Sequence, residues 1–287
     1  MKVCSRAGLL LGLVVAGLTV VRPAVCVAGQ KVSVGKNVPA NQLVLMDQID
    51  HGVWDGLLKR YVDDNGNVAY AQWQKSAQDT QALDSYLAAL SSANPKARAS
   101  NEATLAFWIN AYNAVTIRGI LREYPTTSVR NHTAKLVGYN IWDDLLLTVG
   151  GNGYSLNQME HEVLRKMSEP RIHFAIVCAS RSCPRLLNQA YTADKLDEQL
   201  TTNTKVFFAN RGNFQYDAAR RQFHLSSILK WFGGDFGDGQ AAQLRTIAPY
   251  LPTRDAHDAA VAGSGSVSHL DYDWGLNDQT AVRAARR

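Results

Sequence analysis

Residues 105–121 form a mainly apolar segment in which only a few polar side chains interrupt the pattern. At about 100° per residue, its apolar side chains cover nearly the whole circumference of a helix. A helix that is apolar on every side is buried at the centre of a protein. The segment therefore predicts a central buried helix that ends before Pro125.

Other segments carry apolar residues at helical spacing or begin with a helix-capping residue. Helical spacing is found over residues 47–61, 83–90 and 196–208. Ser155 opens a Ser-x-x-Gln capping box, which predicts a helix start, and Ser226 precedes a segment that we expect to be helical as far as Trp231. The chain is therefore expected to be rich in helices.

Turn residues and apolar alternation predict a few short strands. Residues 61–70 have the pattern of a hairpin with Asn65 and Gly66 in its turn. Residues 215–225 predict a turn and a strand, and residues 268–274 alternate as a late edge strand does. The short apolar run 174–177 is typical of a buried strand.

A polar loop follows the predicted strand at 174–177. It contains Cys178, Ser180, Arg181, Ser182 and Cys183, and it stops at Pro184. Many α/β enzymes place reactive side chains on loops that follow buried strands. We expect a single α/β domain over residues 46–278, with a small sheet packed on the central helix. An α+β arrangement of the same elements is the alternative fold class.

The two ends of the chain differ from this domain in composition. The first 28 residues resemble an export signal, with Lys2 and Arg6 before an apolar run over 9–21. That run is too short for a comfortable span of ~20 residues. We expect cleavage near Ala28, a periplasmic or secreted protein, and no stable membrane span afterwards. Residues 29–45 read as a polar N-terminal arm, and residues 279–287 as a basic tail.

Charge and the absence of known binding motifs limit the partners and cofactors that the chain is expected to bind. The net charge is +5 and the pI is about 9.0, but the basic residues are scattered and form no stripe with aromatic residues. No Gly-x-Ser-x-Gly elbow, phosphate loop or dinucleotide fingerprint occurs. We therefore expect no nucleic acid and no cofactor, and an unknown ligand or an envelope protein as the partner.

The cysteines leave three interpretations of the loop open. Of the four, Cys4 and Cys26 lie in the predicted signal, so Cys178 and Cys183 are the ones that a mature protein keeps. In an oxidising compartment they are expected to form a disulfide that fixes the shape of the loop. The alternatives are a reactive thiol at Cys183, favoured by the neighbouring Arg181, and two inert free thiols.

A carboxylate and an imidazole lie in the segment that follows Ser155. On a helix, Glu160 falls inside the apolar arc and His161 falls at its edge. Glu160 is then either a tuned acid or base or one half of a structural pair with an arginine. The segment 161–165 misses the zinc-protease pattern His-Glu-x-x-His, because Arg165 replaces the second histidine. We expect no metal site.

Three buried polar residues complete the candidates. Asn110 and Asn113 lie on one side of the predicted central helix, and helix interiors disfavour asparagine unless the amide has a partner. Each amide either binds the backbone of a loop or faces a site, where it can stabilise an oxyanion. His173 begins the predicted strand and is either a core residue or a catalytic base.

Short motifs that contain these candidates follow one another along the chain. They are residues 107–113, 159–161 with Leu164 and Arg165, 173–175 with Cys178 and 182–184, Trp231 with Asp235 and Phe236, and 272–274 with Leu276 and Asn277. In these motifs the chain resembles the exported bacterial branch of the uncharacterised domain-of-unknown-function family 547, from about residue 51 to 277. The resemblance implies no settled reaction. It picks out Asn110, Asn113, Glu160, His161, His173, Cys178 and Cys183.

Two functions are consistent with these residues. In the first, the protein is a thiol-dependent hydrolase or acyltransferase of the cell envelope. Cys183 is then the nucleophile, His161 or His173 the base, Glu160 the orienting group and Asn113 an oxyanion donor. Asn110, Arg181 and Ser182 are candidates for substrate binding. In the second, the protein is a non-catalytic envelope protein that binds a partner or ligand, with a structural disulfide between Cys178 and Cys183.

Overall fold

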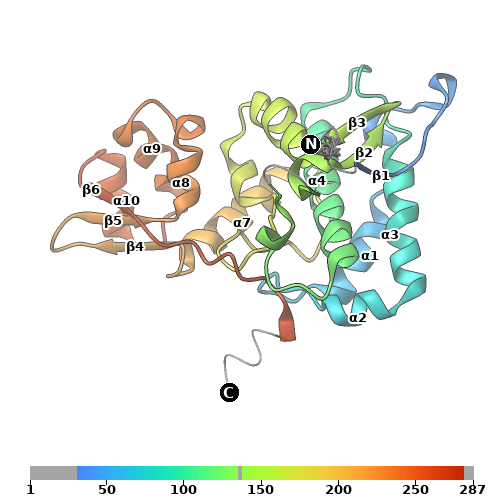
Figure 1. Ribbon diagram of the computed structural model, residues 1–287. Helices are drawn as coiled ribbons and strands as arrows, with labels where there is room; N and C mark the ends of the chain where they lie inside the picture. Colours follow the sequence, from blue (N-terminus) through green and yellow to red (C-terminus); the bar gives the residue numbers. More distant parts are fainter. Residues whose placement is uncertain (1–30, 135–137, 281–287) are drawn as a thin grey trace, which may run out of the picture.

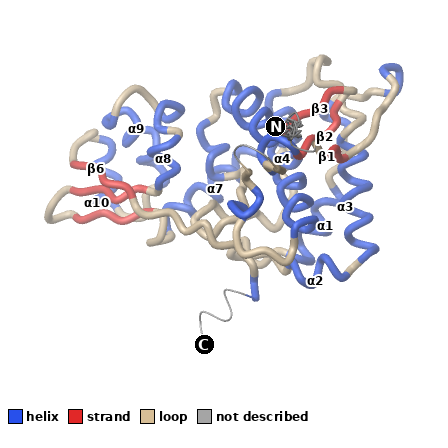
Figure 2. The backbone as a smooth tube through the Cα atoms, in the orientation of Figure 1, coloured by secondary structure: helices blue, strands red, loops and turns tan. Residues whose placement is uncertain are grey.

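The computed structural model describes residues 31–134 and 138–280 (Figure 1). The predicted signal peptide and most of the predicted basic tail lie outside the described residues. The described chain combines helices with two separate three-stranded sheets, so the predicted α/β class is confirmed (Figure 2). No helix within these residues is both long and apolar enough to cross a lipid bilayer.

The central helix α4 (Asn101–Glu123) confirms the prediction made from residues 105–121. Its start is fixed by Ser100, whose hydroxyl accepts a hydrogen bond from the amide of Ala103 at 3.1 Å. Between Ala103 and Leu121 nearly every residue is buried, on all sides of the helix. Burial of each large apolar side chain stabilises the fold by roughly 2 kcal/mol. The many buried side chains of α4 therefore make it the centre of the larger hydrophobic core.

Helices and a small sheet surround α4 in the larger lobe, drawn in blue and green in Figure 1. The helices are α1 (Gly52–Tyr61), α2 (Tyr70–Lys75) and α3 (Ala77–Leu90). The sheet has the order β1 (Val32–Val34), β2 (Leu145–Val149) and β3 (Asn152–Ser155), with β1 parallel and β3 antiparallel to β2. Alternate residues of β2 face the core. The N-terminal arm is therefore partly integrated into the fold, because it supplies β1.

A second, smaller lobe has its own core and is drawn in orange and red in Figure 1. It contains β4 (Phe214–Asp217), β5 (Gln222–Leu225), α8 (Ser227–Trp231), α9 (Gln240–Ile247), α10 (Arg254–Val261) and β6 (Ser266–His269). β4 and β5 form a hairpin, and β6 adds to β5 in parallel. The helix α7 (Leu196–Ala209) joins the lobes, since its first half packs in the larger core and Phe207 and Phe208 in the smaller one.

The strand predicted at 174–177 is wrong. The chain instead forms a 3-10 helix over Pro170–Phe174 and then an irregular turn, and it is buried from Ile172 to Val177. Side-chain amides replace the neighbouring strand as hydrogen-bond partners. Asn113 of α4 donates to the carbonyl of Ala175 at 3.0 Å and accepts from the amide of Val177 at 2.9 Å. Asn203 of α7 donates to the carbonyl of Phe174 at 2.6 Å.

The helix predicted after Ser155 begins as expected but does not stay regular. The capping box is present, with reciprocal hydrogen bonds of 3.2 and 3.0 Å between Ser155 and Gln158. After the short helix α6 (Leu156–Gln158), the chain passes through a π-turn over Met159–Val163 and a 3-10 turn over Leu164–Met167. Such π-turns are frequent at functional sites.

Two predicted strand features are present in shortened form. The hairpin at 61–70 has its turn, but its arms meet in a single bridge between Val62 and Val68. The late strand begins earlier than predicted, as β6, and residues 270–274 are irregular. Both segments also pair with distant parts of the chain: Val68 forms a bridge to Asp278, and β6 pairs with β5.

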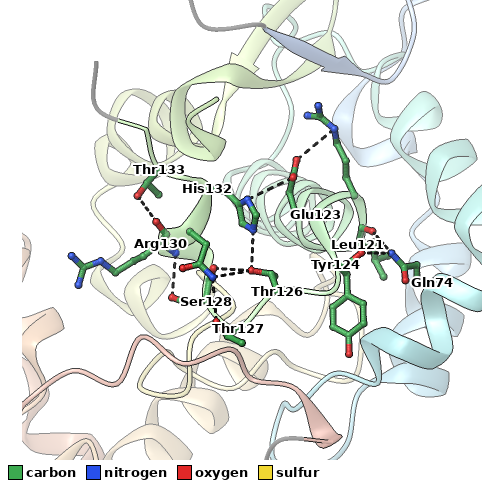
Figure 3. A network of polar contacts seen from close by, with 12 residues as sticks. Gln74, Leu121, Glu123, Tyr124, Thr126, Thr127, Ser128, Arg130, His132 and Thr133 are labelled. Atoms are coloured by element: carbon green, nitrogen blue, oxygen red, sulfur yellow. Dashed lines mark hydrogen bonds and ion pairs between the residues drawn. The ribbon is translucent and has the colours of Figure 1, made fainter. Parts of the chain in front are cut away.

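A polar network at the end of α4 fixes the loop that follows this helix (Figure 3). The ring of His132 contacts the Thr126 hydroxyl at 2.9 Å and the Glu123 carboxylate at 3.6 Å. The same loop holds the C-terminal segment 274–276: the Ser128 hydroxyl donates to the Trp274 carbonyl at 2.7 Å, and the Leu276 amide donates to the Thr127 carbonyl at 2.8 Å. The network thus positions the segment that supports the cysteine loop.

Candidate functional site

A cavity of about 210 Å³ brings together five of the residues singled out from the sequence: Glu160, His161, His173, Cys178 and Cys183. Both lobes contribute to its walls, since Tyr112 comes from α4, Ile228 from α8 and Tyr272 from the chain after β6. The other lining residues are mainly aromatic or apolar: Trp142, Ile176, Pro184, Trp231, Phe232 and Trp274, with Asn157. A mainly apolar cavity with a few polar groups is the usual form of a small-molecule site.

The cysteine loop is held in place by the segment 273–277. Ala179 has a left-handed backbone with φ of +62°, which turns the chain sharply between the cysteines. Its carbonyl accepts from the Asn277 amide at 3.0 Å, and the Arg181 amide donates to the Gly275 carbonyl at 2.8 Å. Ser180 and Leu276 form an antiparallel bridge. The loop is therefore rigidly placed although it belongs to no sheet.

The two cysteines are free, and their sulfur atoms lie 2.7 Å apart. A disulfide would bring them to about 2.05 Å. The backbone amide of Cys178 donates a hydrogen bond to the sulfur of Cys183 at 2.9 Å. The side chain of Cys178 also contacts the hydroxyl of Ser180 at 2.9 Å and that of Tyr272 at 3.3 Å. The pair is thus surrounded by hydrogen-bond donors.

These donors act differently on the two thiols. Burial by itself raises the pKa of Cys183, but hydrogen bonds from the Cys178 side chain, the Tyr272 hydroxyl and the Cys178 amide outweigh it and lower this pKa to about 7. Burial raises the pKa of Cys178 well above its usual value, and the hydrogen bond to Cys183 adds to the increase. Negative charge is therefore favoured on Cys183 rather than on Cys178.

His173 is held by a carboxylate from the other lobe. It is 3% exposed, and its Nε2 lies 2.7 Å from Oδ2 of Asp235. Because Asp235 also forms a two-pronged ion pair with Arg165, its pKa is lowered to about 2 and it is ionised. The carboxylate therefore assigns the proton of the neutral ring to Nε2. Burial lowers the pKa of His173, so the neutral ring is favoured.

His161 and Glu160 lie on the π-turn, and the rings of His161 and His173 both lie beside the ring of Phe232. The guanidinium of Arg165 contacts Nδ1 of His161 at 3.0 Å, and since guanidinium only donates, the proton of the neutral ring lies on Nε2. The hydroxyl of Tyr112 donates to the carboxylate of Glu160 at 3.1 Å. Burial raises the pKa of Glu160, and this outweighs the opposing effects of His161, Tyr112 and Arg165. Glu160 is therefore a better proton donor than a surface glutamate.

No hydrogen bond joins Cys183 to either imidazole within the part of the chain that the structure describes. Both rings nevertheless line the same cavity as the thiol. A molecule bound in this cavity would therefore lie near the Cys183 thiol and both imidazoles. Catalytic hydrogen bonds are often completed only when the substrate is bound.

Asn113 and Asn110 are bound to backbone rather than turned to the cavity. Asn113 bridges Ala175 and Val177, as described above. Asn110 donates to the carbonyl of Tyr191 at 2.8 Å and accepts from its amide at 2.9 Å. Both are at most 1% exposed. The geometry therefore favours the loop-binding alternative for both amides over the oxyanion role predicted for Asn113 and the substrate-binding role predicted for Asn110.

Arg181 and Ser182 are also outside the cavity lining. The exposed guanidinium of Arg181 lies 3.5 Å from the carboxylate of Asp273. The hydroxyl of Ser182 accepts a hydrogen bond from the amide of Asp273 at 2.9 Å. Both residues therefore fasten the cysteine loop to the neighbouring segment. The substrate-binding role predicted for them is not supported by this position.

Several residues of the site were not predicted as functional. Asp235, Tyr112 and Tyr272 make direct hydrogen bonds to the predicted groups, and Trp231 and Trp274 form an aromatic wall with Tyr272. All five residues occur in the motifs that carry the family resemblance. The order of the motifs along the chain contains no distances between them, so the contacts among these residues could not be predicted.

Elsewhere in the described chain, neither a cleft beside α1 nor a metal-binding cluster includes the predicted residues. The cleft is larger, at about 640 Å³, and lies beside α1 and the start of α7, but it includes none of the predicted residues. Among the described residues, no group of three or more histidine, cysteine or acidic side chains is arranged to hold a metal ion. The 210 Å³ cavity is therefore the candidate functional site.

Comparison with known proteins gives one match. Neither a curated protein nor a solved structure matches the chain. The matching region of the family model contains α4, the π-turn, His173 and both cysteines of the loop, but ends before Asp235 and the aromatic wall. Over residues 97–208 the chain is similar to the family described as "Protein of unknown function, DUF547", which confirms the family resemblance across the centre of the site.

Proposed function

We propose that the cavity is the active site of a thiol-dependent hydrolase or acyltransferase in which Cys183 is the nucleophile. The observation that carries the proposal is the position of Cys183, whose pKa is about 7, in one cavity with His161, His173 and Glu160. A thiol with this pKa is substantially ionised near neutral pH, so it attacks a carbonyl carbon without prior removal of its proton by a strong base.

The other groups support the remaining steps of acyl transfer. The Cys183 sulfur forms a bond to the acyl carbon, the leaving group departs with a proton, and water or an acceptor alcohol or amine then cleaves the thioester. Glu160 supplies the proton to the leaving group, because burial raises its pKa. His173, oriented by Asp235, takes the proton from the attacking water or acceptor through Nδ1. His161 presents Nε2–H as the donor to the oxyanion, a role for which Asn113 is not available.

The cellular setting of this function remains the one expected from the sequence. The N-terminal segment predicts export, so we propose an activity in the periplasm or outside the cell. An acceptor or ligand of the cell envelope then has access to the aromatic mouth of the cavity, where Trp231 is 46% exposed.

The test uses reduced protein and a small chromogenic ester, p-nitrophenyl acetate. We expect a burst of nitrophenol and a thioester that peptide mapping places on Cys183. Cys183→Ser should reduce the burst at least about a hundredfold. Alkylation of Cys183 by iodoacetamide should follow an inflection near pH 7 rather than the value near 8.5 of an unperturbed thiol. A burst that survives in Cys183→Ser, or an acyl group on another residue, would overturn the proposal.

A second candidate function is supported by the short distance between the cysteines. In this alternative the protein is a non-catalytic envelope protein that binds a ligand or partner, and a Cys178–Cys183 disulfide stabilises the loop. The sulfur separation of 2.7 Å and the anchoring of the loop by 273–277 favour it. This alternative predicts no free thiol in the native, unreduced protein and no acyl intermediate after reduction. A burst of nitrophenol from the reduced protein would contradict it.

A further inference from the structure

The two cysteines of the site differ in their surroundings although their sulfur atoms nearly touch. Cys178 is enclosed by Ser180 and Tyr272, whereas Cys183 receives the amide hydrogen of Cys178. Both line the cavity, and the separation between their sulfur atoms is 2.7 Å. Acyl transfer uses Cys183 alone. The position of Cys178 therefore calls for a separate explanation.

The cysteine loop needs little movement for the two sulfur atoms to bond. Shortening the separation from 2.7 Å to about 2.05 Å is a small change. The backbone on both sides is held by hydrogen bonds to the segment 273–277, which involve groups other than the two thiols. The loop that presents the dithiol would thus also hold the disulfide.

We propose that Cys183 and Cys178 form a redox pair with a second activity, thiol–disulfide exchange with small organic disulfides, in which Cys183 attacks and Cys178 resolves. Thiol–disulfide exchange of this kind requires a nucleophilic thiolate that is in contact with a second thiol. The low pKa of Cys183 and the raised pKa of Cys178 agree with the assignment of the attacking and resolving roles. The activity goes beyond the proposed acyl transfer and does not depend on it.

The exchange balances in two steps. The Cys183 thiolate attacks one sulfur of the disulfide R–S–S–R, which forms a mixed disulfide on Cys183 and releases one thiolate R–S⁻. Cys178 then loses its proton to solvent water and attacks the sulfur of Cys183, which forms the Cys178–Cys183 disulfide and releases the second R–S⁻. The dithiol is oxidised by two electrons and the small disulfide is reduced by two. In the oxidised form Cys183 is not available for acyl transfer.

The cavity indicates the class of disulfide. Its volume is about 210 Å³, and aromatic residues form much of its wall. Its described lining contains neither lysine nor arginine, so no permanently charged cation there would neutralise an anionic disulfide. A small, uncharged disulfide with an aromatic or apolar substituent therefore fits best. Dithiodipyridine has these properties, and it releases a coloured thiopyridone.

The experiment uses the full chain with Cys4→Ser and Cys26→Ser, so that Cys178 and Cys183 are its only cysteines. After reduction, dithiodipyridine should release two thiopyridones per chain and leave no adduct, and intact mass should show the loss of two hydrogen atoms. Adding Cys178→Ser should limit the release to one and leave the adduct on Cys183. Adding Cys183→Ser should slow the first release at least about tenfold, because Cys178 is buried and protonated.

Controls separate this outcome from misfolding and from acyl transfer. Urea-unfolded samples of each variant should release thiopyridone at similar rates, and Cys178→Ala serves if Cys178→Ser does not fold. Stable adducts on both cysteines of the folded background chain, or equal rates for Cys178→Ser and Cys183→Ser, would overturn the proposal. The burst with p-nitrophenyl acetate on reduced Cys178→Ser reports acyl transfer separately, so failure of exchange is distinguishable from failure of the proposed function.

Discussion

At the scale of single residues, the site depends on how hydrogen bonds are shared between two adjacent thiols. Burial disfavours the charged form of both. The amide of Cys178 points at the sulfur of Cys183, and the Cys178 thiol itself serves as a donor to it. Charge on Cys183 is therefore stabilised at the expense of charge on Cys178. One loop of six residues thus makes two chemically unequal cysteines.

Asn113 provides a test of the structural role given to the buried amides. Asn113→Ala removes the partner of the Ala175 carbonyl and of the Val177 amide, both in the buried segment before the cysteine loop. Because unsatisfied buried polar groups are costly, we expect the free energy of unfolding to fall by about 2–4 kcal/mol. Urea denaturation followed by circular dichroism measures this change.

The matched control is Asn188→Ala, whose amide makes an exposed hydrogen bond to Asp64. It should change the free energy of unfolding by less than about 0.5 kcal/mol. If Asn113→Ala is as stable as the parent but loses the acyl burst, the amide acts on the reaction and the structural role is wrong.

At the scale of elements, helices were predicted correctly where the apolar pattern or the capping residue lies within one segment of the chain. The all-round apolar pattern located α4, and Ser155 and Ser226 marked real helix starts. The run 174–177 was misassigned because its apolar residues are buried as a strand would be, whereas its backbone is satisfied by Asn113 and Asn203. Local periodicity contains no information about such distant partners.

The close approach of α4 to its neighbours predicts opposite effects for two helical glycines. A Cβ at Gly119 would lie 2.8 Å from side-chain carbons of both Ile141 and Leu145, whereas a Cβ at Gly56 of α1 would meet nothing within 4 Å. Gly56→Ala should stabilise the protein by about 0.5–1 kcal/mol through helix propensity. In Gly119→Ala, overpacking of about 1–3 kcal/mol should cancel or exceed that gain.

Thermal unfolding of the two variants beside the parent measures this difference. The melting temperature should rise for Gly56→Ala and stay level or fall for Gly119→Ala. An equal rise in both variants would mean that α4 has more room against Ile141 and Leu145 than the structure indicates.

At the scale of the whole molecule, the candidate site lies where the two hydrophobic cores meet. Its residues range from Tyr112 to Trp274 along the chain. The sequence identified most of the chemical groups but not their pairing, because the pairing is created by long-range packing. The link between His173 and Asp235 illustrates this, since it joins the 3-10 helix before the cysteine loop to the 3-10 turn over Gly233–Phe236 in the smaller lobe.

The Asp235 carboxylate therefore makes the free energy of unfolding depend on pH. Its hydrogen bonds to Arg165 lower its pKa from an ordinary 3.8 to about 2, despite the opposing effect of burial. A carboxyl group whose pKa is lower in the folded state than in the unfolded state stabilises the fold at pH values above its unfolded-state pKa. This stabilisation is lost as the pH falls through its folded-state pKa. The contribution should thus be complete above about pH 4 and disappear toward about pH 2.

Asp235→Asn tests this connection. Near neutral pH we expect the variant to be less stable than the parent by about 1–2 kcal/mol, since part of the ion pair is exposed to solvent. The deficit should shrink as the pH falls from about 4 toward 2, because the parent then loses the same interaction. Urea denaturation of both proteins across this range measures it, with Asp271→Asn as a control for loss of an exposed carboxylate. A deficit that stays constant down to the lowest pH would show that Asp235 acts through packing rather than through its charge.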